Sequence, residues 1–341
     1  MHTVKLQDNL DEIKIAAEII KGGGIVAFPT ETVYGLGANA LNEEAVKAVY
    51  LAKGRPSDNP MIVHIGNMGM LEQLVQYVNE DSAKLMRACW PGPITFILPK
   101  SDLVPSVTCG GLDTVAIRMP ANKVALALIN ASGVPIAAPS ANISGRPSPT
   151  NYQDVVEDMD GRIDAIIQSE DCKVGIESTV VNLCSGTPVI LRPGFYTKEK
   201  LTELLGKPVE YDRTLYENGI GALDPAKGAS DIDGFKPLSP GMKYKHYAPK
   251  AQVRLIRGND ESARQRIMML GLEAKRNGEK VAVLDYDGDA EKAGKKFFAD
   301  LRELDRQNYD LILVRTLDEE GFGFSIMNRM LKSAGYDIVE D

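Results

Sequence analysis

The sequence predicts an α/β protein of two domains, an N-terminal mixed sheet with flanking helices and a smaller C-terminal parallel α/β domain. Three observations lead to this prediction. The chain has 341 residues, 44% of them apolar, which is more than a single hydrophobic core usually organises. Strand candidates outnumber helix candidates up to residue 205, and strands and helices alternate regularly after residue 243. We therefore expect domains at 1–205 and 243–341, joined by a linker at 206–242.

The N-terminal part opens with an amphipathic helix. Segment 10–21 places apolar side chains at helical spacing, and three glycines at 22–24 end the helix. The apolar run at 25–28 is then a buried strand. Further strands are expected at 61–65, 94–98, 114–119, 135–139, 164–168, 178–183 and 188–192, and helices near 43–52, 122–131, 151–159 and 197–205. Because short turns separate several strands, a mixed sheet is favoured over a purely parallel one.

Segment 206–242 has no apolar period and is rich in glycine, proline, aspartate and serine, which is typical of a linker. Long segments of this kind are often functional loops or lids. The chain after it follows a β-α-β-α-β-α pattern, with strands at 252–256, 281–285 and 310–314 and helices near 260–277, 290–305 and 322–333. No G-x-G-x-x-G follows its first strand, so nucleotide binding is not predicted there.

The charge distribution disfavours a protein that grips a nucleic-acid backbone. The formal net charge is −8, with 18 basic and 18 acidic residues from position 243 onward and 21 basic and 29 acidic residues before it. Proteins that bind phosphate backbones usually show a basic face or tail. The N-terminus lacks a signal-peptide pattern, and no apolar run approaches the roughly 20 residues that cross a bilayer. We expect a cytoplasmic protein without membrane association.

The cysteines at 89, 109, 172 and 184 form no C-x-x-C pair. In a reducing compartment they are free thiols, and we expect all four to be small buried side chains. The three histidines are too scattered for a zinc site built from histidine and cysteine. Mg²⁺ carried in with phosphate is the metal that we expect.

Four polar clusters lie at or just beyond strands, at 29–39, 53–64, 139–150 and 175–194. Loops at strand ends are where α/β sheets present ligand-binding residues. Glycine and proline in these clusters are explained by tight turns, but the hydroxyl groups and cations beside them are not. We therefore expect the clusters to form one binding site.

The second and third clusters suggest an anion site. Lys53 and Arg55 flank a glycine, and lysine and arginine are the side chains that commonly bind phosphates. The alternative is that the two residues only form a solvated helix end. Ser140 and Asn142 alternate after a strand, so both side chains point the same way. The donor-rich turn that follows could wrap phosphate or ribose, or could cap the helix near residue 151. We predict an anionic nucleotide between these two pairs.

Seven segments, taken in order, resemble the signatures of a known family. They are PTETVYGLGANA, KGRPSDNPMIVHI, WPGPITFIL, VAIRMP, PSANISGRPSPT, GIESTVV and LRPG, and they resemble the Sua5/YrdC/YwlC family of threonylcarbamoyl-AMP synthases. The resemblance spans residues 10–205. PGMKYKHYAP at 240–249 resembles the segment that opens the additional Sua5 domain of the long family members. The implied fold is a YrdC-like twisted mixed sheet followed by a Rossmann-like Sua5 domain.

The resemblance implies a nucleotidyltransferase. Members of the family combine L-threonine, bicarbonate and ATP into threonylcarbamoyl-adenylate, pyrophosphate and water. A partner complex then uses the adenylate to modify adenosine 37 of tRNAs. The substrates expected for this chain are thus L-threonine, bicarbonate and ATP, with Mg²⁺ as the expected cofactor.

The resemblance also implies site residues. The catalytic tetrad corresponds to Lys53, Arg55, Ser140 and Asn142. The ATP-binding residues correspond to Arg55, Asn59, Thr114, Ser140, Ser148, Arg192 and Tyr247, and the threonine-binding residues to Thr32, His64, Arg118, Ala138 and Ser178.

The chemistry fits these residue types. Reactants and leaving group are all anionic, so positioning and cations matter more than an acid–base pair. Arg118 suits the threonine carboxylate as a bidentate partner, and Thr32 and Ser178 could contact the amine or the hydroxyl. Glu31 and Glu177 either hold the ammonium group or structure the turns. His64 is expected to contact substrate rather than to act as general base, because no carboxylate partner is evident.

Three other interpretations concern the linker and the function. Tyr244, His246 and Tyr247 suit a flap over the nucleotide, and the alternative is that they only begin the second domain. In place of the synthase, the domain could be a double-stranded RNA-binding module with weak RNA affinity. It could also be an enzyme that transfers a carbamoyl group from carbamoyl phosphate.

Overall fold

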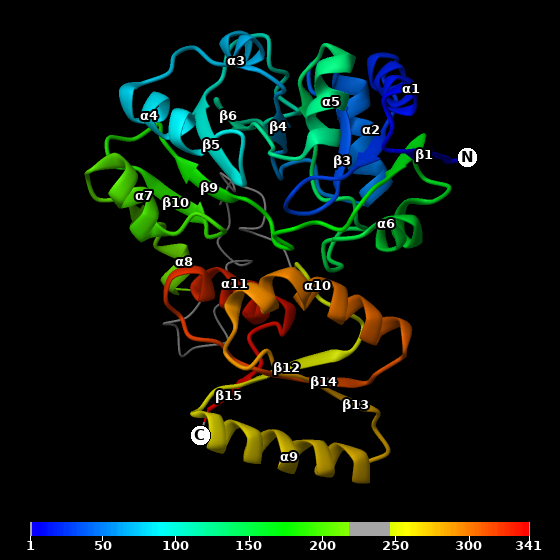
Figure 1. The fold of residues 1–341 in the computed structure, drawn as a ribbon, viewed down its shortest axis with the longest axis vertical. Coiled ribbons are helices and arrows are strands. Elements are labelled where there is room, and N and C mark those ends of the chain that lie inside the picture. Colours follow the sequence, from blue (N-terminus) through cyan, green and yellow to red (C-terminus); the bar gives the residue numbers. More distant parts are fainter. Residues whose placement is uncertain (1, 218–245, 341) are drawn as a thin grey trace.

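The computed structural model describes residues 2–217 and 246–340, which form two units stacked on one another (Figure 1). We call residues 2–217 the large unit and residues 246–340 the small unit. The large unit is built on an eleven-stranded mixed sheet and the small unit on a four-stranded parallel sheet. The predicted α/β fold class is confirmed.

The large sheet has the strand order β1-β8-β2-β3-β7-β4-β6-β5-β9-β10-β11. Pairs such as β4 with β6 are parallel, whereas pairs such as β5 with β6 are antiparallel, so the predicted mixed sheet is confirmed. Its strands are β1 (Val4–Gln7), β2 (Val26–Phe28), β3 (Gly35–Asn39), β4 (Ile62–His64), β5 (Ile94–Pro99), β6 (Thr114–Arg118), β7 (Ile136–Ala137), β8 (Ala165–Gln168), β9 (Thr179–Asn182), β10 (Val189–Arg192) and β11 (Glu210–Tyr211).

The helices of the large unit cover the sheet and bury its apolar side chains. The predicted first helix is observed as α1, capped by Asn9, with its apolar stripe buried. The helices are α1 (Leu10–Lys21), α2 (Glu43–Lys53), α3 (Met68–Leu74), α4 (Glu80–Cys89), α5 (Lys123–Ser132), α6 (Tyr152–Met159), α7 (Lys198–Leu205) and α8 (Thr214–Glu217). Of these, α3, α4 and α8 were not among the predicted helices.

Strand β3 corrects the expectation that residues 29–39 are all loop. A Cβ atom on Gly37 would lie 2.7 Å from both the Phe28 ring and the Ile136 side chain. Glycine therefore lets β3 lie between β2 and β7, because side chains of those two strands fill the space that a larger residue in β3 would need. A strand of this composition carries little β-propensity, so local sequence did not reveal it.

The small unit has the strand order β13-β14-β12-β15, and all its pairs are parallel. Figure 1 shows α10 and α11 between this sheet and the large unit, with α9 on the opposite face of the sheet. Its elements are β12 (Gln252–Ile256), α9 (Asp260–Arg276), β13 (Val281–Leu284), α10 (Ala290–Arg306), β14 (Leu311–Arg315), α11 (Gly321–Ser333) and β15 (Ile338–Val339).

The first part of the predicted linker is structured. Strand β11 pairs in parallel with β10, and α8 follows it, so residues 206–217 extend the large unit. The rest of the predicted linker, 218–242, and Tyr244 lie outside the described residues. Cys184 is exposed, which contradicts the expectation that all four cysteines are buried; Cys89, Cys109 and Cys172 are buried. Cys184 follows β9 in a surface turn, and local sequence did not distinguish that position from a core position.

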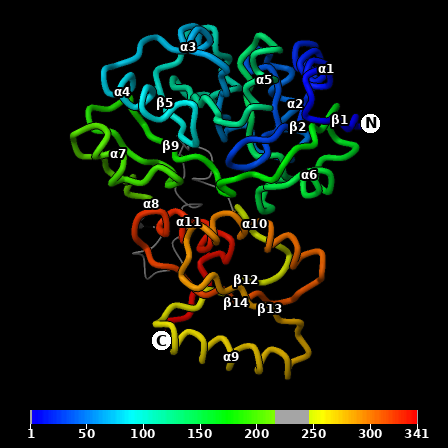
Figure 2. The backbone as a smooth tube through the Cα atoms, viewed as in Figure 1, coloured from blue at the N-terminus to red at the C-terminus, as the bar shows by residue number. Residues whose placement is uncertain are grey.

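The chain path in Figure 2 places the N-terminal strand β1 at the edge of the large unit and the C-terminal strand β15 beside the start of α9. Within the described residues, none of the helices combines the length and the apolar character needed to span a bilayer.

Candidate active site

A cavity that is partly open to solvent lies where loops of the large sheet meet residues 246 and 247 at the start of the small unit. It brings together residues of all four predicted polar clusters, including Arg55 and His64 of the second cluster. The lining residues are Thr30, Thr32, Val33, Tyr34, Gly35, Arg55, Ile62, His64, Arg118, Ala138, Pro139, Ser140, Glu177, Ser178, Arg192, His246 and Tyr247.

Arg118 is the central cation of one side of the cavity. It ends β6 beside His64 of β4 and is only 3% exposed. Its Nη1 donates to the Thr32 hydroxyl at 2.9 Å, and its Nη2 lies 2.7 Å from a Glu31 carboxylate oxygen without hydrogen-bond geometry. Nε and Nη2, which form one edge of the guanidinium, have no hydrogen-bond partner among the described residues. Two parallel donors of this kind match a carboxylate.

Ser178 lines the same cavity and is held from two sides. The Ser178 and Thr95 hydroxyls are 2.8 Å apart, and Arg192 donates from Nη2 to the Ser178 hydroxyl at 3.1 Å and from Nε to its carbonyl at 3.0 Å. Burial lowers the pKa of Arg192 to about 10, which still leaves it charged at neutral pH. The hydroxyl is therefore fixed beside a buried positive charge.

His64 is a neutral imidazole in this structure. Burial, followed by the charge of Arg118, lowers its pKa to about 3. Its Nδ1 lies 3.1 Å from the Ile62 carbonyl, to which the Nδ1–H tautomer donates. A ring held in this way by a backbone carbonyl can contact substrate.

The four residues predicted as a catalytic tetrad lie close together, although they do not all line the cavity. The Ser140 hydroxyl donates to Asn142 Oδ1 at 2.5 Å, so the two side chains do point the same way. Lys53 Nζ donates to the carbonyls of Ser140 and Asn142, both at 2.5 Å. Lys53 is 2% exposed, and burial together with Arg55 holds its pKa well below the usual range. The structure thus places Lys53 behind the loop that carries Ser140, and Arg55 and Ser140 on the cavity wall.

The remaining ATP-binding candidates lie at different places. Asn59 is buried and is not among the lining residues, and its Oδ1 accepts no hydrogen bond from the described residues. Thr114 begins β6, at the opposite end from Arg118, and is not among the lining residues. Tyr247 lines the cavity and stacks on Phe298 with ring centroids 5.0 Å apart. Ala138, which is one of the threonine-binding candidates, also lines the cavity.

Glu177 connects the large unit to the small unit. One of its oxygens accepts from the Ser148 hydroxyl at 2.6 Å, and the other lies 3.2 Å from Nε of Arg329 on α11. Burial opposes the ionised form, but Arg329 and Arg192 outweigh it and lower the pKa of Glu177. Glu177 therefore joins the turns to α11, whereas Glu31, which is not among the lining residues, pairs with Arg118.

Comparison with known families agrees with this geometry. A family model for Sua5, YciO and YrdC proteins, described as telomere recombination, matches residues 18–194, which is more than half of the chain. The chain belongs to the Sua5/YciO/YrdC family. A second model, described as the C-terminal domain of threonylcarbamoyl-AMP synthase, matches residues 196–335, so this is a member of the long Sua5 type.

Relatives of the long Sua5 type match over almost the whole chain. A threonylcarbamoyl-AMP synthase of Pyrococcus abyssi is 44% identical over 99% of this chain and 98% of its own length. One of Bacillus subtilis is 43% identical over 99% of this chain and 97% of its own length. The crystal structure of P. abyssi Sua5 complexed with L-threonine superposes with a TM-score of 0.90, is 42% identical and covers 100% of both chains.

Three residues of this Sua5-type chain that contact the candidate site were not singled out from the sequence. Arg302 of α10, Arg329 of α11 and Asp158 of α6 are all buried and contact the site loops. The available signal was their position in the helical period: Arg302 lies between Leu301 and Asp305 on the buried face of α10. A charged residue at a core-facing helix position needs a partner, but the sequence alone does not name it.

Proposed function

We propose that this chain is an L-threonylcarbamoyladenylate synthase. It joins L-threonine, bicarbonate and ATP into threonylcarbamoyl-AMP, pyrophosphate and water. The product passes to a tRNA threonylcarbamoyl-transfer complex, so the reaction is the first step of the modification of adenosine 37. The membership of the family and the full-length similarity to threonylcarbamoyl-AMP synthases support this assignment.

The observation that carries the proposal is the Nε–Nη2 edge of Arg118, which lies beside Glu31 but has no hydrogen-bond partner among the described residues. Arg118 lines the cavity together with Thr32 and Ser178, which supply hydroxyl groups, and the Glu31 carboxylate lies against Arg118. This set matches an amino acid: the guanidinium receives the carboxylate, and Glu31 attracts the ammonium. The hydroxyl groups are neutral hydrogen-bonding partners for a polar side chain such as that of threonine.

The other side of the cavity suits a nucleotide. Arg55 and Ser140 line it, Arg192 adds a buried cation, and Tyr247 offers an aromatic face. Lys53 and Asn142 hold the Ser140 loop in shape rather than facing the cavity. We therefore assign direct nucleotide contacts to Arg55, Ser140, Arg192 and Tyr247 and a positioning role to Lys53 and Asn142.

The reaction then follows from the placement of charge. The threonine amine attacks bicarbonate, a C–N bond forms and water leaves, which gives an N-carboxylate. An oxygen of that carboxylate attacks the α-phosphorus of ATP as the bond to pyrophosphate breaks. Every species is anionic, so the arginines lower the barrier by holding the reactants together and stabilising the negative charge that shifts to pyrophosphate.

Mg²⁺ is part of this proposal only as the ion that accompanies the triphosphate. Among residues 2–217 and 246–340, no group of three or more histidine, cysteine, aspartate or glutamate side chains is arranged to hold a metal ion. We therefore assign no protein ligands to Mg²⁺ and derive no step through it.

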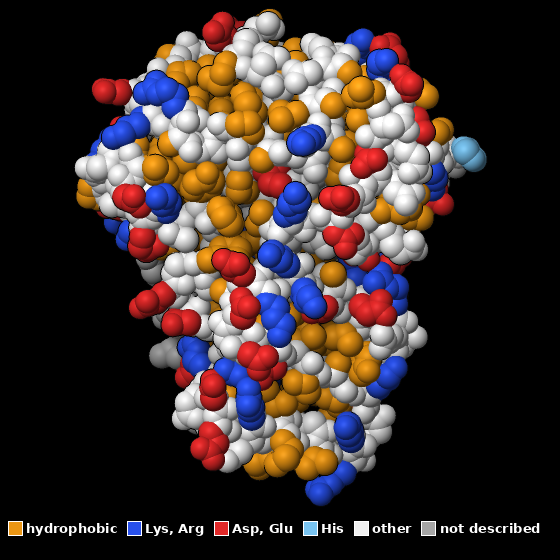
Figure 3. Space-filling view, viewed as in Figure 1, with side chains coloured by type: hydrophobic (Ala, Val, Ile, Leu, Met, Phe, Trp, Pro, Cys, Tyr) orange, Lys and Arg blue, Asp and Glu red, His pale blue; other side chains and the backbone are white. Residues whose placement is uncertain are grey.

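The surface seen in Figure 3 does not favour the RNA-binding alternative. Basic and acidic side chains are interleaved over this face rather than gathered into a region of one sign. A phosphate backbone is best held by a continuous basic surface. The cavity chemistry is the more specific observation, and it favours the synthase.

The test is mass spectrometry of the full chain incubated with ATP, L-threonine and bicarbonate. We expect threonylcarbamoyl-AMP and an equal amount of pyrophosphate, and neither when threonine or bicarbonate is omitted. Replacing bicarbonate with carbamoyl phosphate tests the carbamoyl-transfer alternative. A chain that binds ATP but forms no threonylcarbamoyl-AMP with all three substrates would contradict the proposal.

A further inference from the structure

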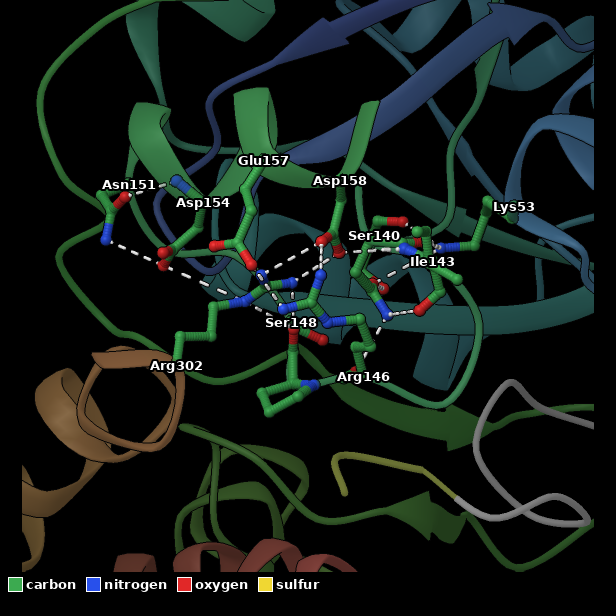
Figure 4. Close-up of polar contacts among 12 residues, drawn as sticks. Lys53, Ser140, Ile143, Arg146, Ser148, Asn151, Asp154, Glu157, Asp158 and Arg302 are labelled. Carbon is green, nitrogen blue, oxygen red and sulfur yellow. Dashed lines mark hydrogen bonds and ion pairs between the residues drawn. The ribbon is translucent and has the colours of Figure 1, made fainter. Parts of the chain in front are cut away.

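Arg302 of the small unit reaches into the loop that carries Ser140. Its Nη2 donates to the Pro147 carbonyl at 2.7 Å and to an Asp158 carboxylate oxygen at 2.7 Å, and its Nε donates to the same carbonyl at 3.0 Å. Figure 4 shows this side chain extending from α10 toward α6 and the loop. The Arg302 and Asp158 side chains are both 0% exposed.

Asp158 in turn contacts the N-terminal part of the same loop. Its carboxylate accepts from the backbone N–H of Ile143 at 3.0 Å and pairs with Arg146. Lys53 holds the Ser140 and Asn142 carbonyls from another direction (Figure 4). Loop 140–148 is thus fixed at residues 140 and 142 by Lys53, at 143 by Asp158 and at 147 by Arg302.

We propose that Arg302 is a positioning residue for the nucleotide, through which the small unit sets the shape of loop 140–148. The inference rests on the proposed function, because that loop is assigned to ATP binding through Ser140. A buried guanidinium with a bidentate set of acceptors defines one loop geometry, whereas a loop without it samples several. Affinity for a ligand falls with the fraction of molecules in the binding geometry.

None of the contacts of Arg302 within the described residues reaches the threonine side of the cavity. Arg118, Thr32 and Ser178 are held by contacts with one another and with Thr95 and Arg192, all within the large unit. Loss of Arg302 therefore acts on ATP and spares threonine. A purely structural role would instead lower the affinity for both substrates together.

Arg306 is the matched control. It lies one turn further along α10, is buried less deeply than Arg302, and pairs with Asp154 at 2.7 Å and Glu157 at 3.3 Å on α6. It shares the helix, the charge and the facing helix with Arg302, but its hydrogen bonds within the described residues reach no backbone atom of loop 140–148.

The experiment measures ATP and L-threonine dissociation constants and steady-state kinetics for the full-length wild type and the variants Arg302→Lys, Arg302→Met and Arg306→Met. We expect both Arg302 variants to bind ATP roughly 10- to 100-fold more weakly, with threonine affinity changed less than about threefold. The KM for ATP should rise while kcat at saturating ATP stays within about threefold. Arg306→Met should change neither affinity by more than about threefold.

Each other outcome counts against the proposal. Wild-type ATP affinity retained in Arg302→Met, or equal losses for ATP and threonine, overturns it. If Arg302→Met does not fold, Arg302→Lys and Asp158→Asn carry the test, and retained ATP affinity in both overturns it. A wild type that does not bind ATP contradicts the proposed function itself, which separates the two failures.

Discussion

The two sides of the cavity are held in different ways. The threonine side rests on Arg118, Thr32 and Ser178, whose partners all lie in the large unit. The nucleotide side depends on loop 140–148, which receives contacts from Arg302 of the small unit, and on Glu177, which pairs with Arg329. The large unit is therefore enough to shape the proposed amino-acid site, whereas the proposed nucleotide site is completed at the junction of the two units.

The largest effect is expected on the threonine side. Arg118→Lys replaces the two-donor edge with a single ammonium that cannot match a carboxylate bidentately. We expect kcat/KM for threonine to fall about 100-fold, equivalent to about 2.7 kcal/mol of transition-state stabilisation. ATP affinity should change little, because the partners of Arg118 belong to the threonine side. Steady-state kinetics with calorimetric ATP titration measure both, and comparable losses for the two substrates would show that the two sides are not independent.

A second variant breaks the junction instead. Gly175 has φ +81°, and a Cβ there would lie 2.3 Å from the Gly294 carbonyl oxygen of α10. Gly175→Ala should therefore cost about 2–3 kcal/mol of stability, through backbone strain and displaced packing, and weaken ATP binding more than threonine binding. Thermal unfolding and the two dissociation constants report this.

Gly186→Ala is the control for that variant, because nothing lies within 4 Å of a Cβ at that position. It should leave the midpoint of unfolding within about 2 °C and both affinities unchanged. Equal behaviour of the two alanine variants would contradict the close approach at the junction.

The smallest effect is a change in the pH dependence of stability. Arg329 and Arg192 hold the pKa of Glu177 below the ordinary value of a glutamate carboxyl. A carboxylate whose folded pKa is depressed stabilises the protein above the unfolded pKa, and that contribution is lost as pH falls through the folded pKa. Glu177→Gln should thus lower stability by about 1–2 kcal/mol at pH 7 and flatten its decline below about pH 4.5.

Denaturant unfolding at several pH values measures the Glu177 contribution. The difference in unfolding free energy between wild type and Glu177→Gln should be constant from pH 7 down to about pH 5 and shrink below that. A difference that grows on acidification would mean that Glu177 is not held ionised by the arginines.

Several features of the fold and the site could be predicted from local patterns. The helix α1 follows from its apolar period, its Asn9 cap and its terminal glycines. The common direction of Ser140 and Asn142 follows from the alternation of an extended chain, and their hydrogen bond confirms it. Strand β3 was not predicted, because the side chains that require glycine in it belong to the neighbouring strands β2 and β7 and not to β3 itself.

The sequence by itself determined the residue types of the site and their order along the chain, because local spacing fixes helices, strands and turns. Only the tertiary structure decided that Lys53 lies behind the Ser140 loop, that Glu177 faces Arg329, and that Arg302 anchors Pro147. Arg302 and Pro147 are 155 positions apart. A buried charge needs a partner. Which partner it meets depends on how the two units pack, and no local sequence pattern encodes that packing.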